Sequence, residues 1–550
     1  MHQPIRIELD ALTDLDATLA GLDAANVTER LWAKDHTLWR DDPTEIANRL
    51  GWLDLARQAP DDDPELAGFL AGVRDAGLTD AVVLGMGGSS LGAEALRASY
   101  EGRVEGLRLH VLDSTHPDWV RRIRSDLDPA KTLFLVASKS GTTAEVMAFF
   151  HFFWAETVAA VGEAEAGSHF VVVTDPGSPL IGLAEERHFR HVFLNPSDIG
   201  GRFSVLSRFG LVAAALIGID PGALLGRAHA LALASLAGRP AAETPGVWLG
   251  AVLGTAARAG RDQLTLLASP RFECFGLWAE QLIAESTGKD GVGILPVTGE
   301  PAVTAERYDD RRLFVAMRDR EVPGDVDARV DALVAAGQPV VVYELEDLDA
   351  LGAELFRWQV ATAVAGHLLA IHPFDQPNVQ SAKSETRRLL DVFESEGALP
   401  AVEASADLLG ELSHPPRPAY VALMAFTDAS PELEAAIADL RHHLLDDLGL
   451  ATTFGYGPRF LHSTGQLHKG GAPGGLFVQL ITSGEDLAIA GQPYGFGTLV
   501  GAQSGGDLAA LQKAERRCVR LDLGDDPVAA IRRLIDREEG MSPVADLPFF

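Results

Sequence analysis

The stretch TLFLVASKSGTTAEV, from Thr132 to Val146, decides the fold class. A continuous apolar run ends in small and polar residues, and a segment with helical periodicity follows it. The same pattern recurs in DAVVLGMGG, LRLHVLD and HFVVVTDPG. Apolar strands that alternate with helices predict a parallel sheet covered on both faces, with ligands at the carboxyl ends of the strands. The hydroxyl and ammonium donors of residues 138–143 therefore fall where ligands bind.

Two further α/β regions follow this first one. The runs QLTLLAS (263–269), RLFVAMRD (312–319) and PVVVYEL (339–345) predict strands of a second unit, with helices in CFGLWAEQLIAEST and LFRWQVATAVAGHLLA. Beyond about residue 395 the pattern is looser, with strands in AYVALMAF and GLFVQLI and a helix through PELEAAIADLRHHLLDDLG. We expect these segments: helical 1–60, α/β units at 61–240 and 241–395, and a carboxyl-terminal α/β extension at 396–550.

Composition limits the class of protein. A chain of 550 residues with 47% hydrophobic content can bury several cores. The net charge of -32 argues against nucleic acid, whose binding depends on Lys and Arg at phosphates. No signal peptide or apolar window of about 20 residues is evident, so we expect a cytoplasmic protein without membrane contact. Cys274 and Cys518 lie far apart without metal-ligand spacing, which argues against a disulfide framework or a zinc site.

The loop after the Thr132 strand is a candidate phosphate site. Ser138, Ser140, Thr142 and Thr143 would bring hydroxyls to the first turn of a helix, where free backbone amides and the positive helix end also favour an anion. Ordinary helix capping by one Ser or Thr, or a capping box, is the alternative interpretation. Four hydroxyls around one glycine exceed what capping requires, so we favour phosphate binding.

A glycine-rich segment, GMGGSSLG from Gly85 to Gly92, closes the preceding strand. It lacks the GxxxxGK[ST] pattern of a phosphate-binding loop in nucleotide-hydrolysing enzymes, and Ser90 stands where a dinucleotide fingerprint has its third glycine. Asp113, at the end of the next strand, could mimic the ribose-binding acid of dinucleotide sites but is equally a turn residue. Nucleotide binding therefore stays a weak alternative.

Two further segments offer groups for proton chemistry. In IGGRFS, Arg202 follows two glycines, so its guanidinium could lie against an anion or a developing enolate, or could form an ordinary surface ion pair. In EQLIAESTGKDG, Gln281 and Glu285 share a helix face by their i, i+4 spacing. A half-buried glutamate has a raised pKa that suits proton transfer, whereas an exposed carboxylate at a helix end would be unremarkable.

Five segments in this order, GMGGSSLG, SKSGTT, GGRFS, AESTGK and PFDQPNVQSAK, resemble the signature segments of glucose-6-phosphate isomerases. The resemblance covers about residues 80–395 and implies two sugar-isomerase (SIS) domains with parallel, flavodoxin-like sheets flanked by helices. The segment RFLHSTGQLHKGG and the long carboxyl end look like the isomerase half of fused transaldolase/glucose-6-phosphate isomerase polypeptides. The transaldolase half is absent from this sequence, and association with a separate transaldolase is left open.

The resemblance assigns the chemistry to particular residues. Glu285 matches the base that moves a proton between C1 and C2 through a cis-enediol, and Arg202 matches the arginine that stabilises this intermediate. Lys383 matches a lysine that assists opening of the sugar ring. The residues that match substrate-binding positions are Ser138, Lys139, Ser140 and Thr143 of the phosphate loop, Gly88 and Ser89 of the first glycine-rich segment, Gln281, and Gln376. Neither a metal nor a redox cofactor is required.

The main departure concerns the histidine that opens the sugar ring in many relatives, shortly before the strand that corresponds to PVVVYEL. No histidine lies there. His462 and His468 are the substitutes, with a slight preference for His468, and His372 is a weaker third. The alternative is that both are surface histidines; a zinc pair lacks a third ligand. Asn378 and Gln380 also replace the Gly and Glu that are usual in their motif.

We therefore expect an enzyme that interconverts glucose 6-phosphate and fructose 6-phosphate. The family implies a homodimer in which the ring-opening histidine comes from the neighbouring subunit. Two alternatives stay open: an isomerase that also accepts mannose 6-phosphate, and a sugar-phosphate-binding regulator without turnover.

Overall fold

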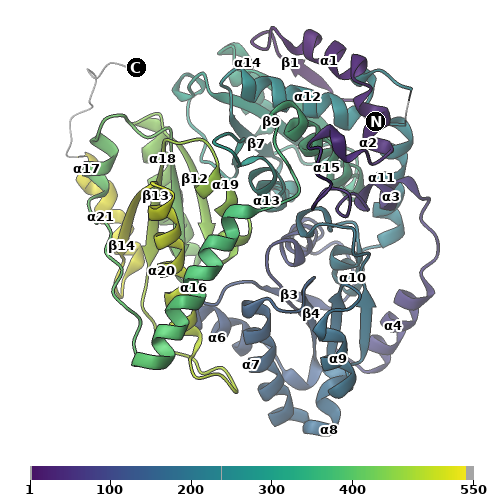
Figure 1. Cartoon of the computed structure of the whole chain (residues 1–550), viewed down its shortest axis with the longest axis vertical. Coiled ribbons are helices and arrows are strands. Elements are labelled where there is room, and N and C mark those ends of the chain that lie inside the picture. The colour runs from purple at the N-terminus through teal and green to yellow at the C-terminus, as the bar shows by residue number, and fades with distance from the viewer. Residues whose placement is uncertain (1–2, 237, 540–550) are drawn as a thin grey trace.

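Three parallel sheets, each covered by helices, make up the chain (Figure 1). The computed structural model describes residues 3–236 and 238–539. In Figure 1 the first sheet lies at the lower right, the second at the top and the third, in green and yellow, at the left. The prediction of an α/β fold with parallel sheets is confirmed.

The first sheet has the strand order β3-β2-β4-β5-β6, and all its pairs are parallel. Its central strands are buried along their whole length because β-branched and leucine side chains face helices on both sides. The strands are β2 (Asp80–Leu84), β3 (Arg108–Leu112), β4 (Thr132–Ala137), β5 (Phe170–Thr174) and β6 (His191–Leu194). The helices of this region are α5 (Leu91–Ser99), α6 (Pro117–Ser125), α7 (Ala144–Val161), α8 (Glu163–Ala166), α9 (Pro179–Glu186), α10 (Arg208–Leu216) and α11 (Pro221–Ala234).

Helix α7 is long and apolar enough, by length and composition alone, to cross a membrane. In this fold it covers the first sheet instead: Phe149 and Phe153 are fully buried, and Phe153 stacks on Phe134 of β4. Its composition is therefore explained by core packing.

The second sheet has the order β8-β7-β9-β10, with the short strand β1 added antiparallel to β10. The strands are β1 (Arg6–Glu8), β7 (Gln263–Ala268), β8 (Leu295–Val297), β9 (Arg312–Asp319) and β10 (Val340–Leu345). The main helices are α12 (Pro245–Arg258), α13 (Phe275–Thr287), α14 (Val326–Ala335) and α15 (Leu351–Leu368). Within the predicted helical segment 1–60, strand β1 is an exception, because residues RIE pair with an open sheet edge.

The helices of the amino-terminal segment pack around the first two sheets. They are α1 (Leu15–Ala24), α2 (Val27–Trp32), α3 (Trp52–Arg57) and α4 (Pro64–Asp75). Trp39 donates its indole N–H to the carbonyl of Ala363 in α15 at 2.9 Å, and Trp52 stacks on Phe203. The tryptophans of this segment therefore anchor it in the core.

The third sheet has the order β12-β11-β13-β14 and is entirely parallel. Numbered within each unit, the four parallel strands of all three sheets share the order 2-1-3-4, and the first sheet adds a fifth. The strands are β11 (Tyr420–Phe426), β12 (Ala451–Tyr456), β13 (Gly475–Ile481) and β14 (Arg517–Asp522). The helices are α16 (Pro377–Glu396), α17 (Leu408–Ser413), α18 (Pro431–Asp446), α19 (Gly465–Gly470), α20 (Phe496–Lys513) and α21 (Pro527–Glu539).

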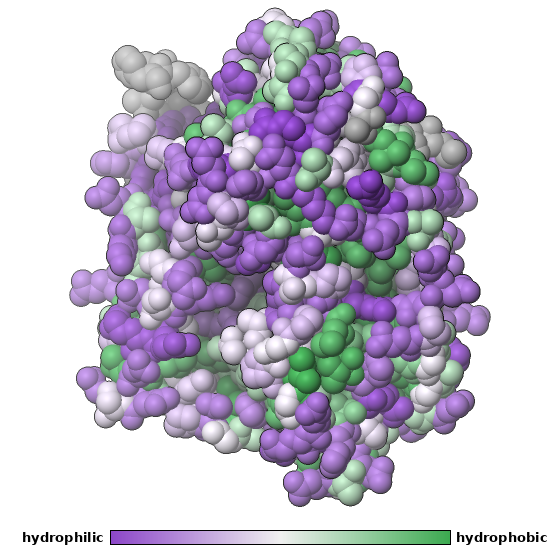
Figure 2. Space-filling view, turned by 45° about the vertical axis from the view of Figure 1, so that its right-hand side comes forward, coloured by the Kyte–Doolittle hydropathy of each residue, from purple (hydrophilic) through white to green (hydrophobic). Residues whose placement is uncertain are grey.

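The surface carries mostly hydrophilic side chains on the face shown in Figure 2. The net charge of -32 reflects 78 acidic residues against 46 lysines and arginines over the whole sequence.

Candidate active site

Helix α13 carries the carboxylate of the site. Glu285 is buried, with 6% of its surface exposed, which excludes the alternative of an exposed carboxylate at a helix end. Gln281, one turn earlier, donates to Glu285 Oε2 at 3.1 Å. The predicted i, i+4 pair therefore exists and fixes the orientation of the Glu285 carboxylate.

Arg202 lies against Glu285, in the 3₁₀ turn η5 (Gly201–Phe203). The shortest distance between its Nη1 and Glu285 Oε2 is 3.4 Å, and the guanidinium is buried. Nε donates to the Ser286 hydroxyl at 2.9 Å and Nη1 to Gln376 Oε1 at 2.6 Å. The alternative of a surface ion pair is therefore wrong: Arg202 joins α13 to the segment before α16.

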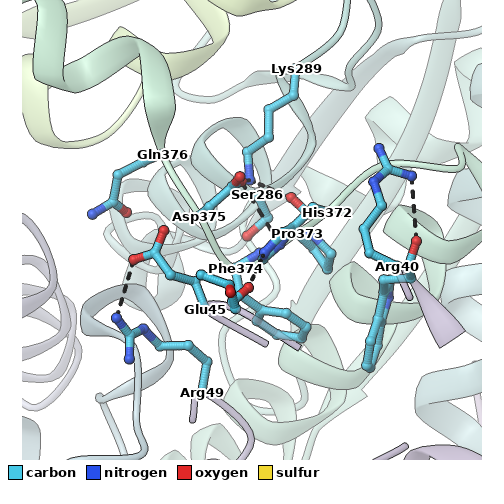
Figure 3. Close-up of polar contacts among 12 residues, drawn as sticks. Arg40, Glu45, Arg49, Ser286, Lys289, His372, Pro373, Phe374, Asp375 and Gln376 are labelled. Atoms are coloured by element: carbon cyan, nitrogen blue, oxygen red, sulfur yellow. Dashed lines mark hydrogen bonds and ion pairs between the residues drawn. The ribbon is translucent and has the colours of Figure 1, made fainter. Parts of the chain in front are cut away.

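The segment His372–Gln376 is held by two buried cations. Arg202 Nη2 donates to the carbonyls of Pro373, at 2.9 Å, and Asp375, at 2.8 Å. Lys289 donates to the His372 carbonyl at 2.5 Å and pairs with Asp375 Oδ1 at 2.7 Å. Figure 3 shows the Lys289 side chain directed at this segment beside Ser286. Burial, aided by the charge of Arg202, lowers the pKa of Lys289 to about 7 against the opposing effect of Asp375.

The two residues predicted from the last motif lie at and after the start of α16. Gln376 directly precedes the helix and accepts from Arg202. Lys383 is exposed on α16, and its charge contributes to lowering the pKa of Glu145 on α7. Lys383 is therefore close enough to the first unit for its charge to act on Glu145.

The predicted phosphate loop turns from β4 into α7 with Thr143 as the residue before the helix. Ser138 Oγ lies 3.0 Å from Thr143 Oγ1 and accepts from the Gly141 amide, while Ser140 Oγ lies 3.1 Å from Thr142 Oγ1. Thr143 makes no side-chain capping bond, so the capping interpretation is not supported there. The hydroxyls and the first amides of an 18-residue helix gather at one place, as an anion site requires.

Lys139 differs in its surroundings from the hydroxyls of this loop. Its ammonium pairs with Asp175 and donates to the Ser197 carbonyl at 2.9 Å. Burial raises the pKa of Asp175, and Lys139 opposes this effect. In this arrangement Lys139 holds the loop in place and points to the end of β5.

The glycine-rich segment 85–92 packs against the turn η5 and Gln281, at the edge of the same site. A Cβ atom on Gly88 would lie 2.1 Å from the Gly201 carbonyl oxygen, so only glycine lets this segment meet η5. Gly87 has a φ of +56°, and its missing side chain leaves room for Gln281 Nε2 and the His462 carbonyl. Ser89 is half-buried in the same turn. Both glycines allow close backbone approach within the protein, and the substrate-binding role of Gly88 and Ser89 stays a prediction.

Asp113 is fully buried and accepts two hydrogen bonds from Arg459, at 2.7 and 2.9 Å. A carboxylate so occupied does not reach a ribose hydroxyl, which removes the main support for the nucleotide-binding alternative.

His462 belongs to the site by position, although it comes from the third unit. It ends the turn η10 (Arg459–His462), and its carbonyl accepts from Gln281 Nε2 at 2.8 Å. Its Nε2 lies 3.2 Å from Glu145 Oε1 on α7. Burial opposes the ionisation of Glu145, but His462 outweighs it and lowers the pKa of this carboxyl to about 2.

His468 is placed differently, and its surroundings do not support the slight preference for it. It is buried in α19 between Phe460 and Phe477, and neither ring nitrogen has a hydrogen-bond partner among the described residues. Burial, aided by Lys469, lowers its pKa well below the usual range, so it stays a neutral core residue. His372 uses both ring nitrogens on the backbone of Thr44 and Phe374.

Glu280, next to Gln281, faces away from this site into a cavity of about 310 Å³ between α13, α18 and η10. Arg441 and Arg459 also line this cavity. Burial raises the pKa of Glu280 to about 7, and the two arginines oppose that effect. Glu280 is therefore a second buried acid on α13, but on another face.

Sequence reasoning missed Glu145, Lys289 and Asp375 as site residues. Glu145 was visible only as the acid of a possible capping box, and nothing in its spacing indicated a partner 317 residues away. Lys289 stands out in the sequence, because it follows Glu285 by four residues in a glycine-rich stretch, but no role at the site was assigned to it.

The chain is similar in sequence to known proteins. The family model described as phosphoglucose isomerase matches residues 66–290. A glucose-6-phosphate isomerase from Rubrobacter xylanophilus is 30% identical over 424 residues, which is 68% of this chain and 95% of that protein. A glucose-6-phosphate isomerase from Thermus thermophilus is 32% identical over 394 residues, 63% of this chain and 91% of that protein.

Solved structures agree on the architecture. A hypothetical protein from Thermus thermophilus superimposes with a TM-score of 0.60 at 29% identity, covering 70% of this chain and 99% of its own. A glucose-6-phosphate isomerase from Chlamydia trachomatis gives a TM-score of 0.55 at 19% identity, covering 70% of this chain and 86% of its own, and shares the fold.

Proposed function

The chain belongs to the phosphoglucose isomerase family, and on this premise we propose that it interconverts glucose 6-phosphate and fructose 6-phosphate. The observation that carries the proposal is the buried contact of Glu285 with Arg202 and Gln281, beside the hydroxyl loop of β4 and α7. An aldose–ketose isomerase needs a base, a stabilised enediolate and an anchor for the phosphate, and each has a candidate here.

Glu285 is the base of the proposed reaction. Its carboxylate takes a proton from C2 of the open-chain aldose and returns it to C1, through a cis-enediol. Gln281 holds Oε2 of this carboxylate, and Arg202 lies within 3.4 Å of the same oxygen. A buried guanidinium next to the developing enediolate stabilises negative charge more strongly than it would in water.

Ser138, Ser140 and Thr143 hold the phosphate in this proposal. Their hydroxyls replace mutual hydrogen bonds by bonds to phosphate oxygens, and the first turn of α7 adds backbone amides and the helix dipole. Binding energy from the phosphate, remote from C1 and C2, then orients the carbon chain at Glu285.

Turnover of fructose 6-phosphate, coupled to a glucose-6-phosphate dehydrogenase, tests the proposal. We expect activity in the wild type and a loss of about 10³-fold or more in Glu285→Gln, which keeps the shape but not the base. Glu280→Gln is the matched control, because this residue lies on the same helix but faces the separate cavity. Binding of the sugar phosphate without any turnover in the wild type would instead support the regulator alternative, and mannose 6-phosphate as substrate tests the broader isomerase.

The remaining expectations are part of the same proposal. A homodimer would give a mass of about twice 58.6 kDa in light scattering, and association with a separate transaldolase would appear in co-purification. A cytoplasmic location is tested by cell fractionation.

A further inference from the structure

The third α/β unit reaches into the site through the turn η10 and is fixed there by buried contacts to the first unit. The guanidinium of Arg459 makes a two-pronged pair with the fully buried Asp113 at the end of β3. The neighbouring Ser114 hydroxyl donates to the Gly457 carbonyl, at 3.3 Å, and Thr115 donates to Gln503 of α20 at 2.5 Å. Breaking such a pair would leave a charge buried without a partner, so η10 is held in one position.

Contacts to the second unit and to α16 fix the other side of the same segment. Gln466 donates to the Gly288 carbonyl at 3.0 Å, directly after α13. It also exchanges two hydrogen bonds with Asn378 at the start of α16, at 2.7 and 2.9 Å. Asn378 departs from the glycine expected at this place in the motif, and its side chain is used to bind the third unit.

The imidazole of His462 is thereby presented to the site in a defined orientation. Its Nε2 faces Glu145, whose Oε1 also accepts from Gln503 Nε2 at 2.8 Å. The pKa of Glu145 is lowered to about 2, so its carboxylate is ionised at neutral pH and can only accept the hydrogen bond that joins it to His462 Nε2. In the part of the chain that the structure describes, Nδ1 of His462 has no protein hydrogen bond.

We infer that the carboxyl-terminal unit completes the active site within its own chain, with His462 as the acid that opens the sugar ring and Glu145 as its positioning residue. The inference rests on the proposed function. Ring opening breaks the C1–O5 bond, forms the C1 carbonyl, and moves one proton from O1 to O5. His462 gives its proton to O5, the O1 proton leaves to water, and water returns a proton to the imidazole.

This chain is longer than the part of it that the relatives match. The Rubrobacter protein is matched over 95% of its length yet accounts for only 68% of this chain, which leaves about a third of the chain as additional sequence. The family resemblance implies a ring-opening histidine from a neighbouring subunit. Here a third unit with the strand order of the other two provides a histidine to the site of its own chain.

Two reactions separate ring opening from isomerisation. Interconversion of the α and β anomers of glucose 6-phosphate needs ring opening but no proton transfer at carbon, and exchange NMR measures its rate. We expect His462→Asn to lower both the anomerisation and the isomerisation rates by about 10²-fold. Glu285→Gln should lose isomerisation and retain anomerisation. His442→Asn, on the exposed side of α18, controls for the substitution itself.

The outcomes distinguish this inference from the proposed function. If His462→Asn anomerises at the wild-type rate while the wild type isomerises, the role of His462 is wrong and the proposed function stands. If the wild type shows neither reaction, the proposed function fails first. For Glu145→Gln we expect a lower kcat with little change in KM and a shifted pH profile, whereas a purely structural role would lower only stability.

Complementation tests whether the site lies within one chain. We expect that co-expression of His462→Asn with Glu285→Gln gives no more isomerase activity than the two variants separately, because each site keeps one defect. If the histidine came from a neighbouring subunit, a mixed dimer would contain one site with both defects and one with neither. Recovery of about half of the wild-type activity per mixed dimer would therefore overturn the inference.

Discussion

Arg202 combines two tasks that one substitution can separate. Its guanidinium lies 3.4 Å from Glu285 and donates to Ser286, Gln376 and two carbonyls of the segment before α16. Arg202→Lys keeps the positive charge, but the lysine side chain ends in a single nitrogen. This nitrogen cannot reach the partners that the planar guanidinium of Arg202 contacts on both of its sides. The variant therefore retains a cation near Glu285 and loses most of the clamp.

The magnitudes follow from these contacts. Hydrogen bonds from a charged donor contribute about 1.5–3 kcal/mol each, and contacts that share one side chain are not additive. Loss of two of them should lower the free energy of unfolding by about 2–4 kcal/mol. A displaced charge beside the enediolate should lower kcat by about 10²-fold, which corresponds to about 2.7 kcal/mol of transition-state stabilisation.

Urea unfolding and the coupled dehydrogenase assay measure the two effects on the same protein. Gln376→Ala is the comparison, because it removes one partner of the clamp and leaves the guanidinium in place. We expect a smaller loss of stability in Gln376→Ala, about 1 kcal/mol, and a kcat closer to the wild type. A kcat of Arg202→Lys within about twofold of the wild type, together with the expected loss of stability, would refute the catalytic role.

Three further predictions concern the surroundings of the site. Because burial lowers the pKa of Lys289 to about 7, the unfolded chain binds more protons than the folded chain above that pH. Urea unfolding should therefore show that the wild type gains stability relative to Lys289→Met between about pH 7 and 10. A difference in stability that stays constant over this range would contradict the prediction. Arg312→Met leaves Glu300 buried without its cation and should lower the free energy of unfolding by about 3–5 kcal/mol. The double variant with Glu300→Gln should recover part of this loss. An unchanged urea midpoint in Arg312→Met would argue against the ion pair of Arg312 and Glu300. Gly141→Ala places a Cβ 2.2 Å from Ser178 Oγ, which should displace the hydroxyl loop and raise the KM for fructose 6-phosphate. Gly177→Ala, also at positive φ but in open space, should leave KM unchanged.

The hydropathy pattern within short segments of the sequence was sufficient to predict much of the fold. The runs of β4, β9 and β10 are continuous and apolar, and their predicted bounds agree with the structure to within a few residues. The strands β6 and β8 were not predicted because they are short, and β14 was not predicted because polar residues occupy half-exposed positions in it. Strand β12 was not predicted because its sequence ATTFGY contains no continuous apolar run. Their identity as strands comes from their neighbours in the sheet.

The candidate site was predictable where its residues share one helix or one loop. Gln281 with Glu285, and Ser138 with Thr143, are close in sequence and meet as expected. His462 could not be chosen over His468 from sequence, since both lie in the same glycine-rich segment and only the packing of α19 on Phe477 buries one of them. The burial of His468 depends on packing within the third unit, and the position of His462 depends on its contact with Glu145 of the first unit.

The pair between Arg459 and Asp113 joins residues 346 positions apart, and this separation has a consequence for synthesis of the protein. A chain that emerges from the ribosome can form its first two sheets long before β12 and η10 exist. Glu285, Arg202 and the hydroxyl loop would then be assembled on a nascent chain that still lacks His462. Because the last unit brings His462 to the site, we expect full isomerase activity only after translation has passed that turn. A chain terminated before it should isomerise no faster than His462→Asn, about 10²-fold below the complete protein.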